Sequence, residues 1–162
     1  MPAAPLIRAS EEKKLVGLRQ SMSYANNTTF ALWSGFMPRR REIQNTIGND
    51  LYSLQVYDAS FDFSTFDPHK PFEKWAAAEV SSFDNIPDGM HPLVVPAGLY
   101  AVFLHKGPAS EAAGTFGYIF GTWLPASDYV SDQRPHFEIL GEKYKNNAPD
   151  SEEEVWIPIR KK

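Results

Sequence analysis

The 162-residue sequence contains no cysteine, which excludes a disulfide framework and a thiolate metal site. No apolar run approaches the roughly 20 residues that a membrane-spanning helix needs. The residues from Met1 to Arg8 lack the basic segment and the apolar stretch of a secretory signal. These absences predict a cytoplasmic protein that does not bind a membrane.

Positive charge is also scarce. The chain has 16 Lys and Arg residues against 20 Asp and Glu residues, a formal net charge of -4. Binding of nucleic acid depends on clustered Lys and Arg, and the only basic run here is Arg39 to Arg41, which we expect to face water at the end of a helix. The sequence therefore predicts no direct contact with nucleic acid.

Familiar signatures of catalysis and cofactor binding are missing as well. The sequence has no G-x-S-x-G elbow, no phosphate-binding or dinucleotide-binding glycine motif and no H-E-x-x-H zinc motif. Its four histidines, His69, His91, His105 and His136, are isolated and lack paired metal-ligand spacing. Neither a metal site nor a cofactor is predicted.

The length of the chain fits one domain, and its residue patterns predict strands and helices. Residues 1–12 show little apolar periodicity and are expected to form a loose lead-in to a single domain over 13–162. Strands are predicted over residues 13–22, 51–58, 72–81, 96–105, 134–142 and 154–160. Two helices are predicted, one from the Asn/Thr cluster at 25–28 to Pro38 and one from Ser110 to Pro125.

The two helices belong to an internal repeat. Residues 32–38, Leu-Trp-Ser-Gly-Phe-Met-Pro, match residues 119–125, Ile-Phe-Gly-Thr-Trp-Leu-Pro, position by position in residue character. The same offset carries the first strand onto the strand near Ala101. We therefore predict an α+β fold of duplicated βαββ units, with halves at about 13–84 and 94–160. Pseudo-two-fold symmetry would place two main helices on one side of an antiparallel sheet, with a ligand cleft between the halves.

Aromatic residues are abundant, with 4 Trp, 7 Tyr and 11 Phe. For any one of them, filling the core is the simpler interpretation. As a set they also suit a cavity that holds a flat or cationic organic molecule by stacking and cation–π contact, provided that one carboxylate faces it. Glu79, which shares a strand face with Trp75, is one acid in a suitable place.

Glu138 is the second acid that could face such a cavity. Strand alternation places Glu138 on one face with His136 and Leu140, opposite Phe137 and Ile139. Alternation alone leaves open whether Glu138 is solvated on the outer face or is a charge inside an aromatic pocket, and by itself it favours the solvated position.

Several segments together resemble the GyrI-like small-molecule-binding family, which also supplies the effector-binding domain of AraC-type and MerR-type transcription regulators. They are Leu-Trp-Ser-Gly-Phe-Met-Pro-Arg-Arg from 32, Tyr-Ser-Leu-Gln-Val-Tyr-Asp from 52, Pro-Ala-Gly-Leu-Tyr-Ala-Val-Phe-Leu-His-Lys-Gly from 96, Gly-Thr-Trp-Leu-Pro-Ala-Ser from 121, Arg-Pro-His-Phe-Glu from 134 and Val-Trp-Ile-Pro-Ile from 155. The resemblance covers roughly residues 13–160. It implies a duplicated βαββ fold with a cleft for bulky aromatic, often cationic compounds.

The resemblance also implies which residues line the cleft. The family's pocket glutamate lies in the late strand, and the matching position is Glu138, so the resemblance favours the buried placement. The implied ligand-binding residues are Trp33, Phe36, Tyr100, Phe120 and Trp123, with weaker matches at Met37, Tyr57 and Trp75.

Three functions follow from the resemblance. The first is a stand-alone binding protein for amphipathic, aromatic or cationic small molecules; with about a dozen residues before the first strand, it is not expected to be a transcription factor by itself. The second is a hydrolase that opens cyclopropane-containing DNA-alkylating compounds, with Glu138 as general acid or base and Tyr100 assisting. The third is a gyrase-inhibitor-like interaction with an unknown protein partner.

Overall fold

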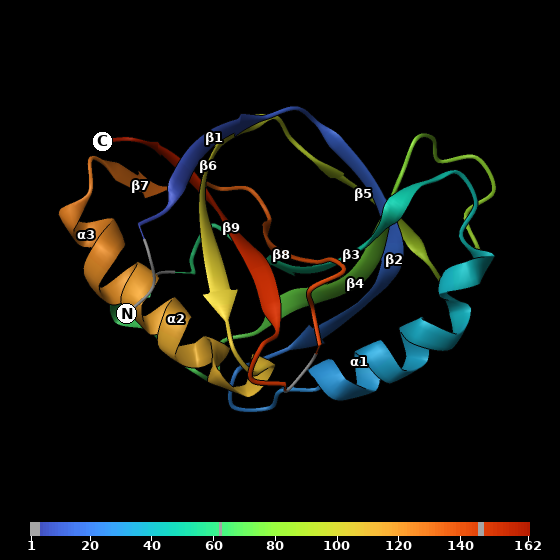
Figure 1. Cartoon of the computed structure of the whole chain (residues 1–162), viewed down its shortest axis with the longest axis horizontal. Helices are drawn as coiled ribbons and strands as arrows, with labels where there is room; N and C mark the ends of the chain where they lie inside the picture. Colours follow the sequence, from blue (N-terminus) through green and yellow to red (C-terminus); the bar gives the residue numbers. More distant parts are fainter. Residues whose placement is uncertain (1–3, 62, 146–147) are drawn as a thin grey trace.

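The computed structural model describes residues 4–61, 63–145 and 148–162 and is built on one antiparallel sheet. The strands are β1 (Leu6–Ser10), β2 (Lys13–Met22), β3 (Thr46–Val56), β4 (Phe72–Val80), β5 (His91–Val95), β6 (Gly98–Lys106), β7 (Tyr129–Ser131), β8 (His136–Leu140) and β9 (Glu152–Lys161). Their order is β1-β6-β9-β8-β3-β4-β2-β5, with β7 paired to β9. The sheet curls, so that β1 and β5 lie on one side of the molecule and the main helices on the other (Figure 1).

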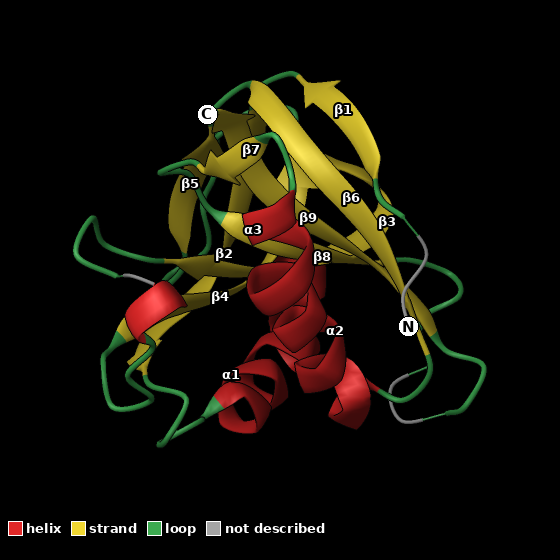
Figure 2. Cartoon of the chain, turned by 90° about the vertical axis from the view of Figure 1, so that its left-hand side faces the viewer, coloured by secondary structure: helices red, strands yellow, loops and turns green. Residues whose placement is uncertain are grey.

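The order of the strands shows the predicted duplication. The first unit is β2, helix α1 (Thr29–Phe36), β3 and β4, and the second is β6, helix α2 (Ala112–Tyr118), β8 and β9. The units meet at the β3–β8 pair, and the strand order reads outward from this pair in the same way on both sides. The α+β fold of duplicated βαββ units is confirmed, with both helices on one side of the sheet (Figure 2).

The prediction of a loose lead-in over residues 1–12 is wrong for Leu6–Ser10. This segment forms β1 and pairs with β6 of the second unit, with Leu6 opposite Val102. In the same way β5, which falls largely between the two predicted halves, pairs with β2 of the first unit. Each unit is thus preceded by a strand that pairs with the other unit.

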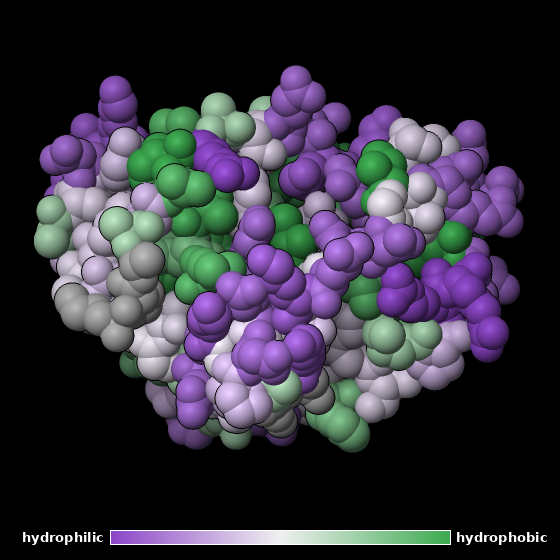
Figure 3. All heavy atoms as spheres, in the orientation of Figure 1, coloured by the Kyte–Doolittle hydropathy of each residue, from purple (hydrophilic) through white to green (hydrophobic). Residues whose placement is uncertain are grey.

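Sequence periodicity missed β1 because this edge strand is held by main-chain pairing and buries little side-chain surface. Leu6 and Ile7 are exposed, and hydrophobic side chains gather over β1 and β6 in the space-filling view (Figure 3). The short strand β7 was also not predicted.

Both predicted helices form close to their expected limits. The Asn27 Oδ1 atom accepts a hydrogen bond from the Thr29 N–H at 3.0 Å where α1 begins, whereas Thr28, the N-cap residue, makes no side-chain capping bond. After Phe36 the chain tightens into the 3₁₀ turn η1 (Met37–Glu42), which contains Pro38. The second helix runs from the turn η3 (Ala109–Glu111) through α2, the π-helical turn η4 (Ile119–Trp123) and α3 (Leu124–Ala126), where Pro125 lies.

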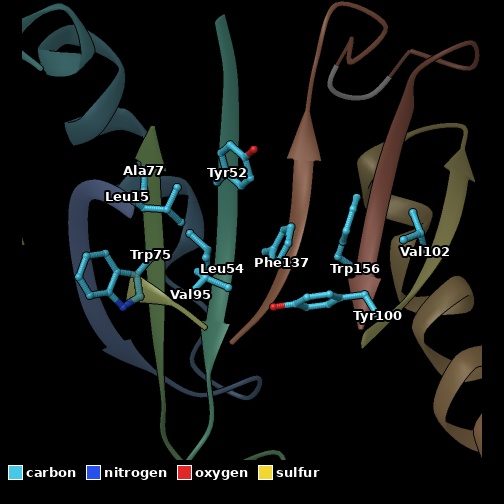
Figure 4. Packing of buried hydrophobic residues seen from close by; sticks show 10 residues of the cluster. All are labelled: Leu15, Tyr52, Leu54, Trp75, Ala77, Val95, Tyr100, Val102, Phe137 and Trp156. Atoms are coloured by element: carbon cyan, nitrogen blue, oxygen red, sulfur yellow. The ribbon is translucent and has the colours of Figure 1, made fainter. Parts of the chain in front are cut away.

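The face of the sheet away from the helices carries one large apolar cluster (Figure 4). Phe137 and Trp156 stack at 5.4 Å between ring centroids, and Tyr100 packs edge-on against both rings. On the helix face, separate clusters lie under α1 and under α2 and its continuation. The space between these two helix-covered clusters is where the sheet is left partly uncovered.

Candidate functional site

A cavity of about 1200 Å³ lies between α1 and α2. Its floor is the helix face of the four central strands, and its walls come from α1, from the start of α2 and from the loop after β8. The volume exceeds the 300 to 1,000 Å³ common for sites that hold drug-sized molecules. The predicted cleft between the two halves is therefore present.

Glu138 lies on the floor of this cavity. It is only 7% exposed, and its Oε1 atom accepts a hydrogen bond from Gln55 Nε2 at 3.2 Å. Its Oε2 atom is buried and has no hydrogen-bond partner among the described residues. Burial raises the pKa of the Glu138 carboxyl, an effect that the charge of Lys74 and the hydrogen bond from Gln55 oppose.

Two further ionisable side chains lie beside Glu138. Lys74 on β4 and Glu153 on β9 line the same cavity and are 7% and 9% exposed. Burial lowers the pKa of the Lys74 ammonium, while burial and the charge of Glu138 raise the pKa of Glu153 to about 7. No described carboxylate lies within ion-pair distance of Lys74, so the three groups interact across the cavity floor without a direct contact.

Strand register brings these polar residues together. Gln55 on β3 lies opposite Lys74 on β4 and opposite His136 on β8. Two residues before Gln55 on β3, Ser53 lies opposite Glu138. Because successive side chains alternate between faces, all of them point to the helix side, and none belongs to the apolar cluster on the other face.

The walls of the cavity are aromatic. The rings come from six residues on both sides of the floor: Tyr24, Phe30, Trp33, Phe72, Phe116 and Tyr144. Phe30 is 87% exposed, although a phenyl ring gains by burial, so it offers free apolar surface at the cavity. Rings around a buried carboxylate form a site suited to a flat or bulky organic cation.

Three of the nine ligand-binding residues predicted from sequence line this cavity: Trp33, Met37 and Glu138. Phe36 is fully buried beneath α1 and packs toward the sheet. The Tyr57 ring lies in an aromatic cluster with Phe61 and Phe72, and its hydroxyl shares a hydrogen bond of 2.5 Å with Tyr24. Tyr57 thus supports the lining residue Tyr24 from behind.

Tyr100 and Trp75 lie on the other face of the sheet. The Tyr100 hydroxyl donates a hydrogen bond to the carbonyl of Pro96 at 3.3 Å, and its ring contacts Phe137, the residue before Glu138. Alternation places Phe137 and Glu138 on opposite faces, so the backbone of β8 separates Tyr100 from Glu138. Tyr100 and Glu138, which were predicted as partners in acid–base chemistry, therefore lie on opposite faces of the sheet.

Phe120 and Trp123 also lie away from the cavity. Trp123 packs edge-on against Phe103 at 5.2 Å between centroids, and Phe120 stacks on Phe63 at 4.1 Å. The internal repeat pairs Trp33 with Phe120, but only the beginning of the second helix reaches the cavity. The remainder of this helix covers β6 and β9, so the equivalence does not extend to ligand contacts.

Sequence reasoning missed Gln55, Lys74 and Glu153. The sequence carried one signal for these residues. In the strand predicted over 51–58, the polar residues Ser53 and Gln55 interrupt the apolar series of Leu51, Leu54 and Val56. Such residues show that one face of a strand is polar. The strand register, which the sequence does not state, was needed to show that they meet at one point.

Comparison with known proteins identifies the family. The family model described as the GyrI-like small molecule binding domain matches residues 4–160. The chain belongs to this family. The chain is also 29% identical over 146 residues to the transcriptional regulator BrlR of Pseudomonas aeruginosa, a match that covers 90% of this chain and 51% of BrlR. The chain thus spans about half the length of this regulator.

Solved structures share the GyrI-like fold. SAV2435 bound to tetraphenylphosphonium superposes with a TM-score of 0.69 at 12% identity, covering 98% of this chain and 94% of that protein. The C-terminal domain of EcmrR superposes with a TM-score of 0.67 at 16% identity, covering 97% of both chains. In the part of the chain that the structure describes, no helix is long and apolar enough to cross a membrane.

Proposed function

We propose that this GyrI-like domain binds amphipathic aromatic monocations in the cavity between α1 and α2, with Glu138 as the counter-charge. The observation that carries the proposal is the Glu138 Oε2 atom, which is buried without a hydrogen-bond partner among the described residues. A buried carboxylate oxygen without a partner is costly, and a cation placed beside it removes that cost.

The aromatic walls supply the rest of the recognition. Trp33 on α1 and Phe116 on α2 line opposite sides of the cavity floor, so their rings can contact a bulky molecule from both sides. Each ring attracts a cation through its negative face by about 0.5 to 2 kcal/mol. Apolar burial adds affinity without demanding one fixed geometry, which suits ligands that vary in shape.

The relatives support the choice of ligand class and of setting. Tetraphenylphosphonium, the molecule bound to SAV2435, combines a single positive charge with four phenyl groups. The likeness to BrlR, a transcriptional regulator, supports a cytoplasmic role in which a small molecule is sensed. The net charge of -4 supports a small-molecule partner in preference to direct contact with nucleic acid.

The test is the affinity for tetraphenylphosphonium of the wild type, Glu138→Gln and Glu142→Gln, measured by isothermal titration calorimetry. Glu142 also lines the cavity but is exposed, so it serves as the matched control. We expect Glu138→Gln to weaken binding roughly tenfold to hundredfold, because a buried charge pair is lost. Equal affinity of Glu138→Gln and the wild type would show that Glu138 is not the counter-charge.

The hydrolase alternative keeps one supporting observation. Burial raises the pKa values of Glu138 and Glu153 in one cavity, and a carboxyl that stays protonated near neutral pH can act as a general acid. Incubation with a cyclopropane-containing alkylator distinguishes the two functions. A ring-opened product formed over many turnovers supports catalysis, whereas stoichiometric retention of the intact compound supports binding.

A further inference from the structure

The floor of the cavity holds more charge than a simple counter-ion site needs. Lys74, Glu138 and Glu153 reach it from β4, β8 and β9, and each is at least nine-tenths buried. A site for a cation needs one carboxylate, and a lysine on the same floor would repel the ligand. With all three groups present, the net charge of the floor decides which of them are ionised with and without the ligand.

In the free protein, two ionised carboxylates and one ammonium would leave a buried net charge of one negative unit. Burying net charge in a poorly polar site is unfavourable, and the usual response is protonation of one group. One proton shared by the two acids gives a floor of zero net charge. Once a monocation is bound, the floor reaches zero net charge with both acids ionised, so the free and bound states differ by one proton.

We propose that Glu153 holds this proton in the free protein and releases it when a monocation binds beside Glu138, so that the cavity exchanges a proton for its ligand. This inference rests on the proposed function. The exchange is balanced, because one positive charge enters the floor and one leaves it. Affinity for a permanent cation then depends on pH, although the ligand itself has no group that titrates.

Glu153 is the better holder of the proton. The ionised form of Glu138 is stabilised by the hydrogen bond that Gln55 Nε2 donates to its Oε1 atom at 3.2 Å. Glu153 has no such amide donor among the described residues, and the charge of Glu138 adds to burial in raising its pKa to about 7. The two acids titrate as a coupled pair in which the proton resides mainly on Glu153.

Two other titratable groups, His105 and Tyr144, lie near Glu153. His105 lies opposite Glu153 in the β6–β9 register, with its Nδ1 atom 2.7 Å from Thr115 Oγ1 and its Nε2 atom 3.0 Å from the carbonyl oxygen of Pro108. Both ring nitrogens are therefore bonded to the segment around α2 and not to Glu153. Tyr144, from the loop after β8, has a pKa raised by burial and by the nearby glutamates, so it remains a neutral phenol.

Around Glu138 the neighbours also remain neutral. Burial raises the pKa of Tyr24 to about 12 and raises the pKa of Tyr57 well above its usual value, while burial lowers the pKa of His136 to about 3. The remaining charged lining residues, Arg40, Asp50 and Glu142, lie at the more exposed parts of the cavity wall. Water screens these three residues, so Lys74 and the two buried glutamates dominate the charge of the floor.

The experiment measures tetraphenylphosphonium binding to the full chain between pH 5.5 and 8.5. For the wild type we expect the affinity to rise by up to about tenfold for each pH unit below pH 7 and to level off above it. Calorimetry at pH 6 in two buffers with different ionisation enthalpies counts the protons. We expect close to one proton released for each cation bound.

Glu153→Gln is the diagnostic variant, because it preserves the shape of the side chain and cannot carry the exchangeable proton. We expect it to bind with an affinity that is nearly independent of pH between 5.5 and 7 and to release almost no proton. Glu12→Gln, which changes an exposed acid outside the cavity, should keep both the slope and the proton release of the wild type. Circular dichroism of each variant checks that it is folded.

Each result has a distinct meaning. Absence of tetraphenylphosphonium binding at every pH would overturn the proposed function itself. Binding by the wild type with no pH slope and no proton release would leave the proposed function intact and overturn proton exchange. This wild-type result does not depend on whether any variant folds. A Glu153→Gln protein that keeps the slope and the release would overturn the assignment of the proton to Glu153.

Discussion

The two faces of the central sheet differ in chemistry, although they are made by neighbouring residues of the same strands. On β8, Phe137 points into an apolar cluster and is fully buried against Trp156, whereas the next residue, Glu138, points into the cavity. One face is filled with rings that contact one another. The other holds buried charges beside an open volume of about 1200 Å³.

The two faces differ in purpose: the apolar face stabilises the fold, and the face with the cavity carries the site. Close-packed aromatic side chains on one face fix the strands, so the other face can keep buried polar groups that lower stability. The site residues are thus held by a layer that the ligand does not contact. Substitutions on each face can therefore test this division.

The filled face should carry much of the stability. Phe137→Ala removes a fully buried ring from the centre of the cluster, and we expect the free energy of unfolding to fall by about 3 to 5 kcal/mol. Urea denaturation measures this change. The control Glu142→Ala, at an exposed position, should change stability by no more than about 0.5 kcal/mol. A loss below about 1 kcal/mol in Phe137→Ala would contradict the division.

The helix face should make the protein sensitive to acid through His136. Burial lowers the pKa of His136 from 6.5 to about 3, so below pH 6.5 the unfolded chain binds a proton that the folded protein does not. Stability from this group therefore falls as pH drops, by about 2 kcal/mol between pH 6 and pH 4.5. Burial of Glu138 and Glu153 acts in the opposite direction, because their raised pKa values lower stability as pH rises.

The contribution of His136 is isolated by comparing the wild type with His136→Gln. Urea denaturation at pH 4.5 and pH 6 gives the difference in stability for each protein. The variant should lose less stability than the wild type on acidification. An identical loss in the two proteins would show that folding does not lower the pKa of His136.

Tyr100 should affect stability and leave ligand binding unchanged. Tyr100→Phe removes the hydroxyl that bonds to Pro96 and keeps the ring, so we expect a loss of about 0.5 to 1.5 kcal/mol in the free energy of unfolding. Affinity for tetraphenylphosphonium should equal that of the wild type, because Tyr100 lies on the filled face. A weaker affinity would show that the two faces are coupled.

Phe30 should show the reverse pattern. Its ring is 87% exposed and lines the cavity, so Phe30→Ala should leave stability within about 0.5 kcal/mol of the wild type. Loss of one exposed cation–π contact should weaken tetraphenylphosphonium binding by about twofold to fivefold. Leu104→Ala, an exposed apolar position outside this cavity, is the matched control and should not change affinity.

Much of the fold was predictable from sequence because local signals agree with it. Alternation in β8 placed Glu138 correctly with His136 and Leu140, and the repeat of residues 32–38 at 119–125 identified the two units. The edge strand β1 was missed because its side chains are exposed and carry no periodic signal. Local patterns report which side chains are buried, and they report poorly on strands held mainly by backbone pairing.

The site was less predictable than the fold. Aromatic residues such as Tyr100, Phe120 and Trp123 were expected at the cavity, yet they fill apolar clusters. An aromatic residue satisfies the same sequence pattern whether it packs in a core or faces a cavity. Lys74 and Glu153 were missed for the opposite reason, since a single charged residue in a strand is ordinarily read as solvent-exposed.

Neighbours along the chain were enough to predict the six strands of the two units, the two helices and the alternation that sets Phe137 apart from Glu138. Which face of the sheet is filled and which is open depends on how the strands and helices pack in three dimensions. The same packing places Lys74, Glu138 and Glu153 on one floor. The physical reason is that strand register and helix placement bring together residues up to 79 positions apart, from Lys74 to Glu153, and a charge acquires its role only from the groups that surround it.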